Sequence, residues 1–247
     1  MDLALKLASG VGADVIVAND PDADRCAVGV REGEAYRMLS GDQVGALLGD
    51  LWLRRGATGT YAASIVSSDL LGRQAAAHGQ PWQQTLTGFK WIGKISDLAF
   101  GYEEALGYCV SPHLARDKDG VTAILAVLEL AATLKAEGRT LLDRLDDIYR
   151  EHGLHVTGQL AVRLDDLSII ADAMQVLRTS PPTDGLRYRL ADGARIIVRP
   201  SGTEPKFKCY LEVVVPVQVE AGVDAARISA AARLDALRDD IRAAAGI

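Results

Sequence analysis

Helical and strand patterns alternate through the middle of this chain, and the alternation limits the folds that the chain can adopt. The first helix predicted in this middle region covers 42–54, where apolar residues recur at helical spacing. The segments that follow are a strand at 60–66, a helix near 70–78, a short strand at 82–85, and helices at 121–136 and 141–149. We interpret 98–113 as a loop between two short strands. The pattern therefore predicts a complete α/β domain with a mixed sheet over residues 40–153.

The two flanking regions have different patterns. Residues 1–39 contain a short amphipathic helix and two strands in an order that resembles part of a βαβ unit, at 2–8, 14–18 and 26–30. Because parallel strands are normally buried on both faces, we expect this partial unit to be the end of an incomplete domain. Residues 154–247 separate strands from helices, which predicts a C-terminal α+β domain. Its strands are expected at 156–163, 195–198 and 207–215, and its helices at 166–177 and 224–244.

Charge and apolar runs limit the partners. The net charge of −6 argues against a nucleic-acid surface, which would need a basic stripe. The apolar run around Ile124 is interrupted by Glu129 well before the roughly 18 residues of a membrane span. We therefore expect neither nucleic acid nor a membrane as a partner, and the lack of a signal-peptide pattern in MDLALKLASG favours a cytoplasmic location. The three cysteines form no CxxC pair, so they predict no disulfide framework or zinc site.

The segment NDPDADR at 19–25 places Asp20, Asp22 and Asp24 directly behind the apolar run 15–18. The three carboxylates converge only if the loop curls, because in an extended strand they would lie several ångströms apart. A divalent cation is the simplest reason for such convergence, and all-oxygen ligation suits Mg²⁺. Since Mg²⁺ commonly joins carboxylates to phosphate oxygens, the loop indicates phosphate chemistry.

Three alternative roles of the aspartate loop compete with Mg²⁺ binding. An EF-hand loop starting at Asp20 would need Gly and Glu where the chain has Arg25 and Arg31, so the EF-hand is excluded. A phosphatase of the haloacid-dehalogenase type also places Asp-x-Asp behind a strand, but none of the aspartates continues in that pattern. A solvated turn built on Asp-Pro stays open as the alternative.

A second polar segment, RPSGTEPKFK, occupies 199–208 between two predicted strands. Ser201, Gly202 and Thr203 offer backbone N–H groups and hydroxyls in a turn that glycine lets approach a ligand closely. Arg199 adds a guanidinium suited to bidentate contact with phosphate. The segment indicates a phosphate cradle, and its alternative is a polar hairpin turn punctuated by two prolines.

The segment GYEEALGY at 101–108 sets Glu103 and Glu104 between two Gly-Tyr pairs. Carboxylates accept hydrogen bonds from sugar hydroxyls, and aromatic rings can frame the face of a sugar. The alternative is a solvated turn that two glutamates open.

Five segments together, NDPDADR, TGFKWIG, GYEEALGY, DKDG and RPSGTEP, occur in an order and at separations that resemble the α-D-phosphohexomutase superfamily. The chain looks like its phosphoglucomutase and phosphomannomutase members, in a branch that also contains phosphopentomutases. The resemblance implies a four-domain, Mg²⁺-dependent enzyme. Its phosphoserine exchanges a phosphoryl group with a hexose phosphate, between the 1- and 6-positions, through a bisphosphorylated sugar. Residues 1–39 would end the second domain, 40–153 would be the third, sugar-binding domain, and 154–247 the fourth, phosphate-binding domain.

The resemblance also implies roles for the residues singled out above. Asp20, Asp22 and Asp24 would hold Mg²⁺, with Arg25 near the phosphate that is transferred. Glu103 and Glu104 would hold sugar hydroxyls. The other phosphate would be gripped by Arg199, Ser201, Gly202 and Thr203, and weaker candidates for phosphate or proton-transfer contacts are Lys90 and Lys118.

The chain departs from the family's pattern in one respect. The Ser-His-Asn-Pro loop that carries the family's phosphoserine is missing, so no catalytic residue is assigned and we expect the chain alone to be inactive. The expected partners are hexose or pentose phosphates, the sugar bisphosphate, and either the missing N-terminal half or a second copy. The alternatives are a sugar-phosphate-binding module without turnover, a phosphopentomutase, and a Mg²⁺-dependent phosphatase.

Overall fold

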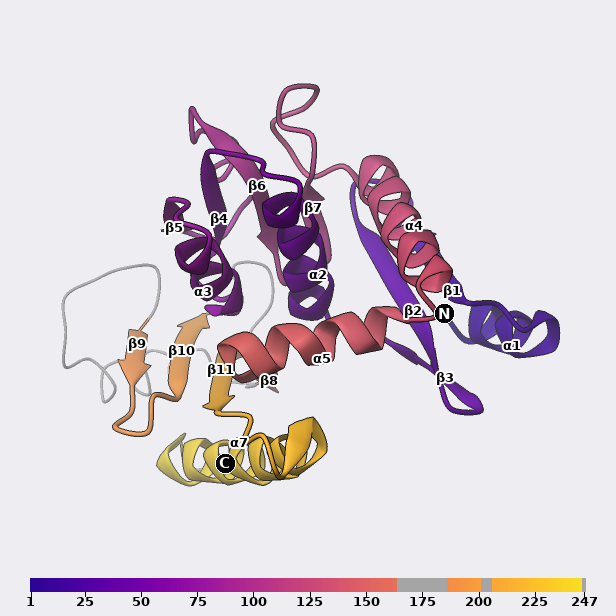
Figure 1. The fold of residues 1–247 in the computed structure, drawn as a ribbon. Coiled ribbons are helices and arrows are strands. Elements are labelled where there is room, and N and C mark those ends of the chain that lie inside the picture. The colour runs from indigo at the N-terminus through magenta and orange to yellow at the C-terminus, as the bar shows by residue number, and fades with distance from the viewer. Residues whose placement is uncertain (164–185, 201–205, 246–247) are drawn as a thin grey trace. The chain divides into compact units, whose positions relative to one another are not determined.

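A computed structural model describes residues 1–163, 186–200 and 206–245 (Figure 1). The chain divides into two compact units, 1–152 and 153–247, which are described separately below. No helix within the described ranges is both long enough and apolar enough to cross a bilayer. The domain boundary expected near residue 39 falls inside the first unit and stays a prediction.

The first unit begins with a small antiparallel sheet. Helix α1 (Asp2–Val11) is followed by strands β1 (Val15–Asn19), β2 (Cys26–Glu32) and β3 (Ala35–Met38). The strands lie in the order β1-β2-β3, and both neighbouring pairs are antiparallel. The helix and first strand of the expected partial βαβ unit are therefore present, but the strands after them do not continue it as parallel strands. The sequence patterns did not predict β3. This four-residue strand follows β2 after a tight turn, in which Gly33 has a φ of 63°.

A second sheet in the same unit has the order β5-β4-β6-β7. Strands β4 (Thr60–Ser64), β5 (Trp82–Thr85) and β6 (Leu98–Glu103) are parallel, and β7 (Gly107–Cys109) pairs antiparallel to β6. Within the segment 98–113, the two short strands are β6 and β7, and the loop that joins them is limited to residues 104–106. The mixed sheet itself is the one that the alternating pattern predicted.

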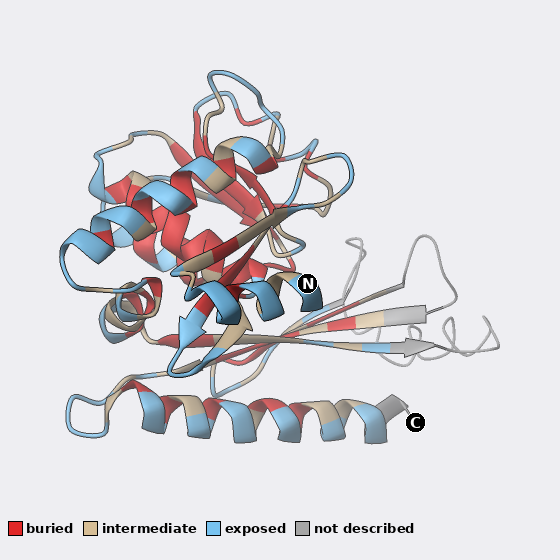
Figure 2. Cartoon of the chain, turned by 90° about the vertical axis from the view of Figure 1, so that its right-hand side faces the viewer, coloured by how far each residue is buried: buried red, intermediate tan, exposed pale blue. Residues whose placement is uncertain are grey.

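Four helices accompany this sheet: α2 (Gly41–Arg54), α3 (Leu70–Ala77), α4 (Gly120–Ala136) and α5 (Leu141–His152). Helix α2 starts at a capping box, in which Ser40 and Gln43 each bond the other's backbone N–H. A Cβ on Gly45 would lie 2.6 Å from the Tyr102 ring, so glycine lets α2 approach β6 closely. Figure 2 shows the resulting core as buried residues on the strands and on the inner faces of the helices.

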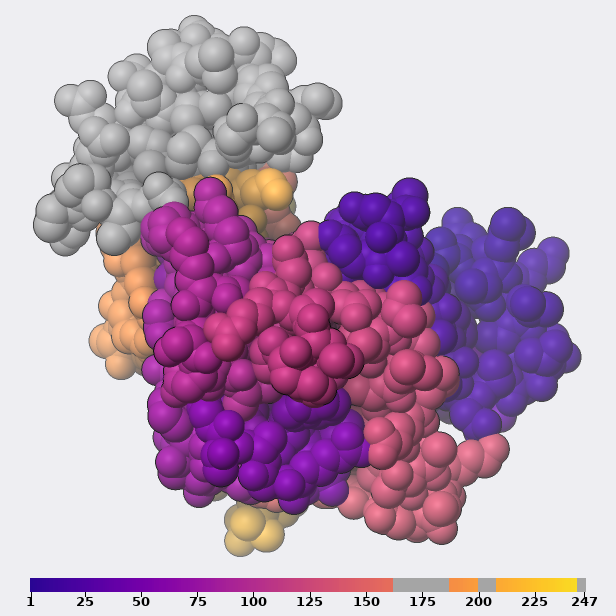
Figure 3. Space-filling view, turned by 90° about the horizontal axis from the view of Figure 1, so that it is seen from above, coloured from indigo at the N-terminus to yellow at the C-terminus, as the bar shows by residue number. Residues whose placement is uncertain are grey.

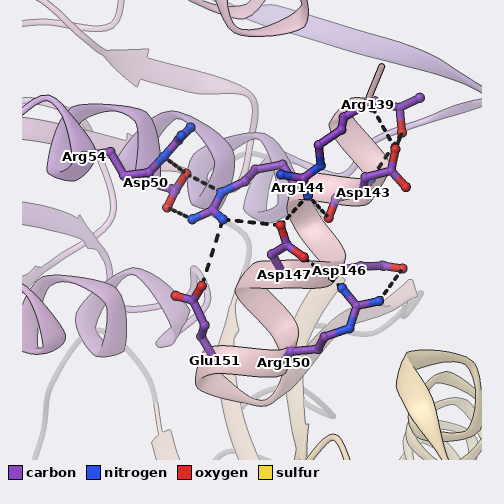
Figure 4. Close-up of polar contacts among 10 residues, drawn as sticks. Asp50, Arg54, Arg139, Asp143, Arg144, Asp146, Asp147, Arg150 and Glu151 are labelled. Atoms are coloured by element: carbon purple, nitrogen blue, oxygen red, sulfur yellow. Dashed lines mark hydrogen bonds and ion pairs between the residues drawn. The ribbon is translucent and has the colours of Figure 1, made fainter. Parts of the chain in front are cut away.

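Charged side chains also join α2 to α5 (Figure 4). Asp50 on α2 is almost fully buried, and its carboxylate accepts hydrogen bonds from Arg144 on α5 at 2.8 and 2.5 Å. Arg54, one turn further along α2, donates to the same carboxylate at 2.9 Å. Because both guanidinium groups engage one carboxylate, the charge on Asp50 is paired twice and fixes α5 against α2.

The second unit has an antiparallel sheet in the order β8-β11-β10-β9. Its elements are β8 (Leu154–Arg163), β9 (Leu186–Arg189), β10 (Arg195–Pro200), β11 (Lys206–Val215) and α7 (Gly222–Ala245), which contacts β8 and β11. This is the predicted α+β arrangement, with β9 as an unexpected short edge strand. The helix expected at 166–177 lies outside the described residues.

Candidate functional site

The loop between β1 and β2 brings its three aspartates together. One carboxylate oxygen from each of Asp20, Asp22 and Asp24 lies within 4.8 Å of the others. The loop curls because Ala23 adopts a φ of 58°, and its N–H donates to the Asp20 carbonyl at 3.0 Å. Asn19 and Arg25, at the two ends of the loop, are joined by a hydrogen bond from Asn19 Nδ2 to the Arg25 carbonyl at 2.7 Å. Convergence of this kind, with oxygen donors only, fits a hard cation such as Mg²⁺.

Arg25 forms hydrogen bonds with the first aspartate of the loop. Its backbone N–H donates to Asp20 Oδ1 at 3.0 Å and its Nε donates to Oδ2 at 2.6 Å. Partial burial alone would raise the pKa of Asp20, but the bonds from Arg25, together with its charge, outweigh burial and lower that pKa to about 2. Asp20 is therefore ionised across the physiological range and is a carboxylate ligand that is already oriented.

The start of α4 supports the loop from the other side. The Lys118 ammonium bonds Asp24, and this bond raises the pKa of Lys118. The Gly120 N–H donates to the Ala23 carbonyl at 3.1 Å, and a Cβ at Gly120 would lie only 2.3 Å from Asn19 Nδ2. Figure 3 shows the indigo N-terminal segment against the pink segment where α4 begins. Because Gly120 has no Cβ, the start of α4 can pack directly against the aspartate loop.

The glutamate loop between β6 and β7 touches the aspartate loop through the backbone. The Cys26 N–H donates to the Leu106 carbonyl at 3.0 Å, where Leu106 has a φ of 70°. This bond and an isolated bridge between Arg25 and Gly107 join the aspartate loop to the hairpin that carries Glu103 and Glu104. Glu103 Oε1 accepts a bond from the Gly88 N–H at 2.7 Å, which links the TGFKWIG turn to this loop.

Glu104 is held by side chains that sequence reasoning missed. Ser64 and Ser67, at the end of β4 and just after it, each donate to Glu104 Oε2 at 3.1 Å. Burial raises the pKa of Glu104, the nearby charge of Asp42 raises it further, and the two serine bonds partly oppose these effects. Isolated serines carry no pattern in a sequence, and only the sheet brings them to Glu104.

The remaining predicted residues lie elsewhere. Lys90 is exposed and its ammonium lies 5.5 Å from the centroid of the Trp91 ring, so it is placed over an aromatic face and not among the aspartates. Arg199 lies in the second unit, on β10, and pairs in register with Lys208 of β11. Ser201, Gly202 and Thr203 are outside the described residues.

Burial of Glu104 gives a prediction about pH. Because the folded state raises the pKa of Glu104 above its ordinary value of 4.5, the unfolded state loses the proton first as pH rises. Stability of the first unit should therefore fall as pH rises from 4.5 up to the raised pKa, and Glu104→Gln should flatten that part of the profile. Urea unfolding followed by tryptophan fluorescence would measure it, since Trp52, Trp82 and Trp91 all lie in this unit. The exposed Glu137→Gln is the control, and an unchanged slope in Glu104→Gln would contradict the prediction.

Comparison with protein families identifies the fold. Residues 40–152 match the family described as phosphoglucomutase/phosphomannomutase, alpha/beta/alpha domain III, and residues 159–230 match its C-terminal domain. The chain is 43% identical over 235 residues to a probable phosphomannomutase of Haemophilus influenzae, a match to 86% of this chain and 48% of that protein. It is also 32% identical to a phosphopentomutase of Mus musculus, covering 87% of this chain and 44% of that enzyme.

Solved structures agree with these matches. A phosphoglucomutase from Paramecium superposes with a TM-score of 0.78 at 23% identity, covering 96% of this chain and 46% of that one. An Aspergillus fumigatus N-acetylphosphoglucosamine mutase, solved with GlcNAc-6P and magnesium, has a TM-score of 0.56 at 16% identity and covers 93% of this chain and 56% of that one. The two domains define a member of the α-D-phosphohexomutase superfamily. More narrowly, the chain belongs to the phosphoglucomutase/phosphomannomutase family and spans about half the length of its curated relatives.

Proposed function

We propose that this chain is the metal-binding and sugar-binding part of a phosphohexomutase of the phosphoglucomutase or phosphomannomutase type. The observation that carries the proposal is the backbone contact between the loop with three convergent carboxylates and the β6–β7 hairpin with two glutamates, in a chain 43% identical to a probable phosphomannomutase. The activity of such an enzyme moves a phosphoryl group between the 1- and 6-positions of a hexose, through a bisphosphorylated sugar.

Each group has a defined task in this proposal. Asp20, Asp22 and Asp24 hold Mg²⁺, which when bound neutralises charge on a phosphate. Arg25 and Lys118 keep the aspartates in position and leave cationic groups beside the loop. Because catalysis of phosphoryl transfer rests mostly on positioning and on charge neutralisation, residues of this kind are the ones that the reaction requires.

The glutamates and Arg199 are proposed as residues that contact the substrate. Glu103 and Glu104 accept hydrogen bonds from sugar hydroxyls, with Glu104 fixed by Ser64 and Ser67. Arg199, together with Ser201, Gly202 and Thr203, binds the phosphate that is not transferred. The phosphoserine comes from a part of the enzyme that the matched residues do not include, so the chain alone binds its ligands without turnover.

The test is phosphorus NMR on glucose 1-phosphate with Mg²⁺ and a trace of the 1,6-bisphosphate, together with calorimetry of Mg²⁺ binding. We expect resonances that shift or broaden without conversion. Asp22→Asn should weaken Mg²⁺ binding by at least about tenfold, because a carboxylate ligand is lost. Asp2→Asn, on the exposed face of α1, removes the same charge outside the loop and should change nothing.

Different results would favour the alternatives. Release of inorganic phosphate without isomerisation would indicate a phosphatase, and tighter binding of ribose phosphate than of hexose phosphates would favour the phosphopentomutase that one relative is named for. No effect of any sugar phosphate on the protein would reject the proposal. Conversion to the 6-phosphate would keep the mutase assignment and contradict the expected lack of turnover.

A further inference from the structure

A second cluster of charged residues lines a pocket of about 230 Å³ at the other end of the first unit. Its walls come from the residues just before β1, the end of β2, the last turns of α4, and the turn that leads from α4 into the start of α5. The charged residues of its lining are Asp14, Arg31, Lys135 and Arg139. Three cations and one carboxylate give the lining a formal charge of +2, in a chain whose net charge is −6. The lining is therefore positive, while the carboxylates of Glu34, Asp143 and Asp147 bond lining residues from outside the pocket.

Two of the three cations make contacts that solvent screens. Lys135 bonds Asp14 at 2.7 Å, but both side chains are more than 60% exposed, so solvent screens the pair. Arg31 lies 3.5 Å from Glu34, which is 98% exposed, and its Nε donates to the Gly33 carbonyl. Arg139 pairs with Asp147 on α5. A ligand with two or more negative oxygens can thus engage Arg31 and Lys135 by displacing water-exposed partners only.

The start of α5 also borders the pocket. Thr140 caps this helix: its Oγ1 accepts from the Asp143 N–H at 3.1 Å, while the Asp143 carboxylate accepts from the Thr140 N–H at 2.7 Å. The pocket is lined by Thr140 and Leu141 at this end of α5, where the Asp143 carboxylate offsets the positive end of the helix dipole. The cavity and its three cations are therefore the features that favour an anionic ligand.

We propose that this pocket binds a small phosphate-bearing anion, at a site separate from the aspartate loop. Guanidinium and ammonium groups, which this pocket offers, are partners that phosphate oxygens favour. Strand β1 begins at Val15, next to Asp14 of the pocket, and ends at Asn19 beside the aspartate loop, while α4 runs back from Gly120 past Lys135. The two sites lie at opposite ends of the same strand, roughly 16 Å apart for five residues of extended chain. An anion in the pocket would bridge the small sheet and the α4–α5 turn, and so stabilise the first unit.

A titration with inorganic phosphate tests the site on the whole chain by NMR of backbone amides. We expect the amides of Gly12, Gly138 and Thr140 to shift and saturate in the millimolar range. Arg31→Gln combined with Lys135→Gln should weaken that binding by about tenfold or more. Lys6→Gln combined with Arg73→Gln removes two charges from exposed positions outside the pocket and should leave the binding unchanged.

Further measurements separate specific binding from other effects. Sodium chloride at equal ionic strength should not shift the three amides, and a shift that chloride reproduces would overturn the proposal. Phosphate shifts confined to residues 19–25 or 199–208 would also overturn it, because the anion would then occupy the proposed substrate site. Single variants at Arg31 and at Lys135 should each show part of the loss. Stronger binding of a phosphorylated sugar than of inorganic phosphate would assign the site to an organic phosphate, and weaker binding would assign it to the free ion.

Discussion

Replacing Arg144 by methionine is expected to lower the free energy of unfolding of the first unit by about 3 kcal/mol, because it leaves a buried carboxylate half-paired. Asp50 has 6% of its side chain exposed, and Arg144, which has 12% exposed, supplies two of its three hydrogen bonds. Arg54 remains on Asp50, but it is 42% exposed and makes a single bond. The loss should therefore be felt where α5 packs on α2 (Figure 4).

Urea unfolding followed by tryptophan fluorescence measures this effect, since every tryptophan of the chain lies in the first unit. Arg150→Met is the matched control: it removes the same group from the same helix at a position 55% exposed, and should cost less than about 1 kcal/mol. Asp50→Leu combined with Arg144→Met should recover most of the lost stability, because an apolar pair leaves no buried charge. A loss equal to that of Arg150→Met would show that the buried pair contributes no more than an exposed one.

Much of the fold could be predicted because apolar periodicity and burial have the same cause. The predicted and observed bounds of the strand at 82–85 agree, and those of the helices at 42–54 and 121–136 differ by one residue at one end. The short strands β3 and β9 could not be found in this way. Each has only four residues, so alternation is too brief to stand out, and pairing with a neighbouring strand decides their conformation.

The candidate site divides along a similar line. The convergence of Asp20, Asp22 and Asp24 could be predicted, because their clustering in the sequence has one simple chemical reason. The supports of the site come from residues far apart in the chain. Ser67 reaches Glu104 across 37 residues, and Lys118 reaches Asp24 across 94. Neither contact has a local signal, so only the folded sheet could reveal which hydroxyl and which ammonium serve the two loops.

Replacing Gly120 by alanine tests whether the start of α4 shapes the metal site. Helix propensity alone would favour alanine by up to about 1 kcal/mol. The new Cβ would lie 2.3 Å from Asn19 Nδ2, 2.5 Å from the Arg25 carbonyl oxygen and 2.7 Å from that of Ala23. Two of these atoms belong to the backbone and cannot rotate away, so overpacking of this kind should cost about 3 kcal/mol. The clash outweighs the propensity, and we expect a net loss of about 2 kcal/mol.

The same clash should also change metal binding, because the three atoms that the new Cβ would meet all belong to residues 19–25, which form the aspartate loop. We expect the dissociation constant for Mg²⁺ to rise by about tenfold in Gly120→Ala, measured by calorimetry under conditions where the variant is folded. Gly10→Ala is the control: a Cβ at Gly10 in α1 meets no atom within 4 Å, so it should leave Mg²⁺ binding unchanged and stabilise the helix slightly. The Gly120 N–H donates to the Ala23 carbonyl, and the clash should disturb this contact between α4 and the loop. Unchanged Mg²⁺ affinity would mean that the loop holds its three carboxylates together without α4.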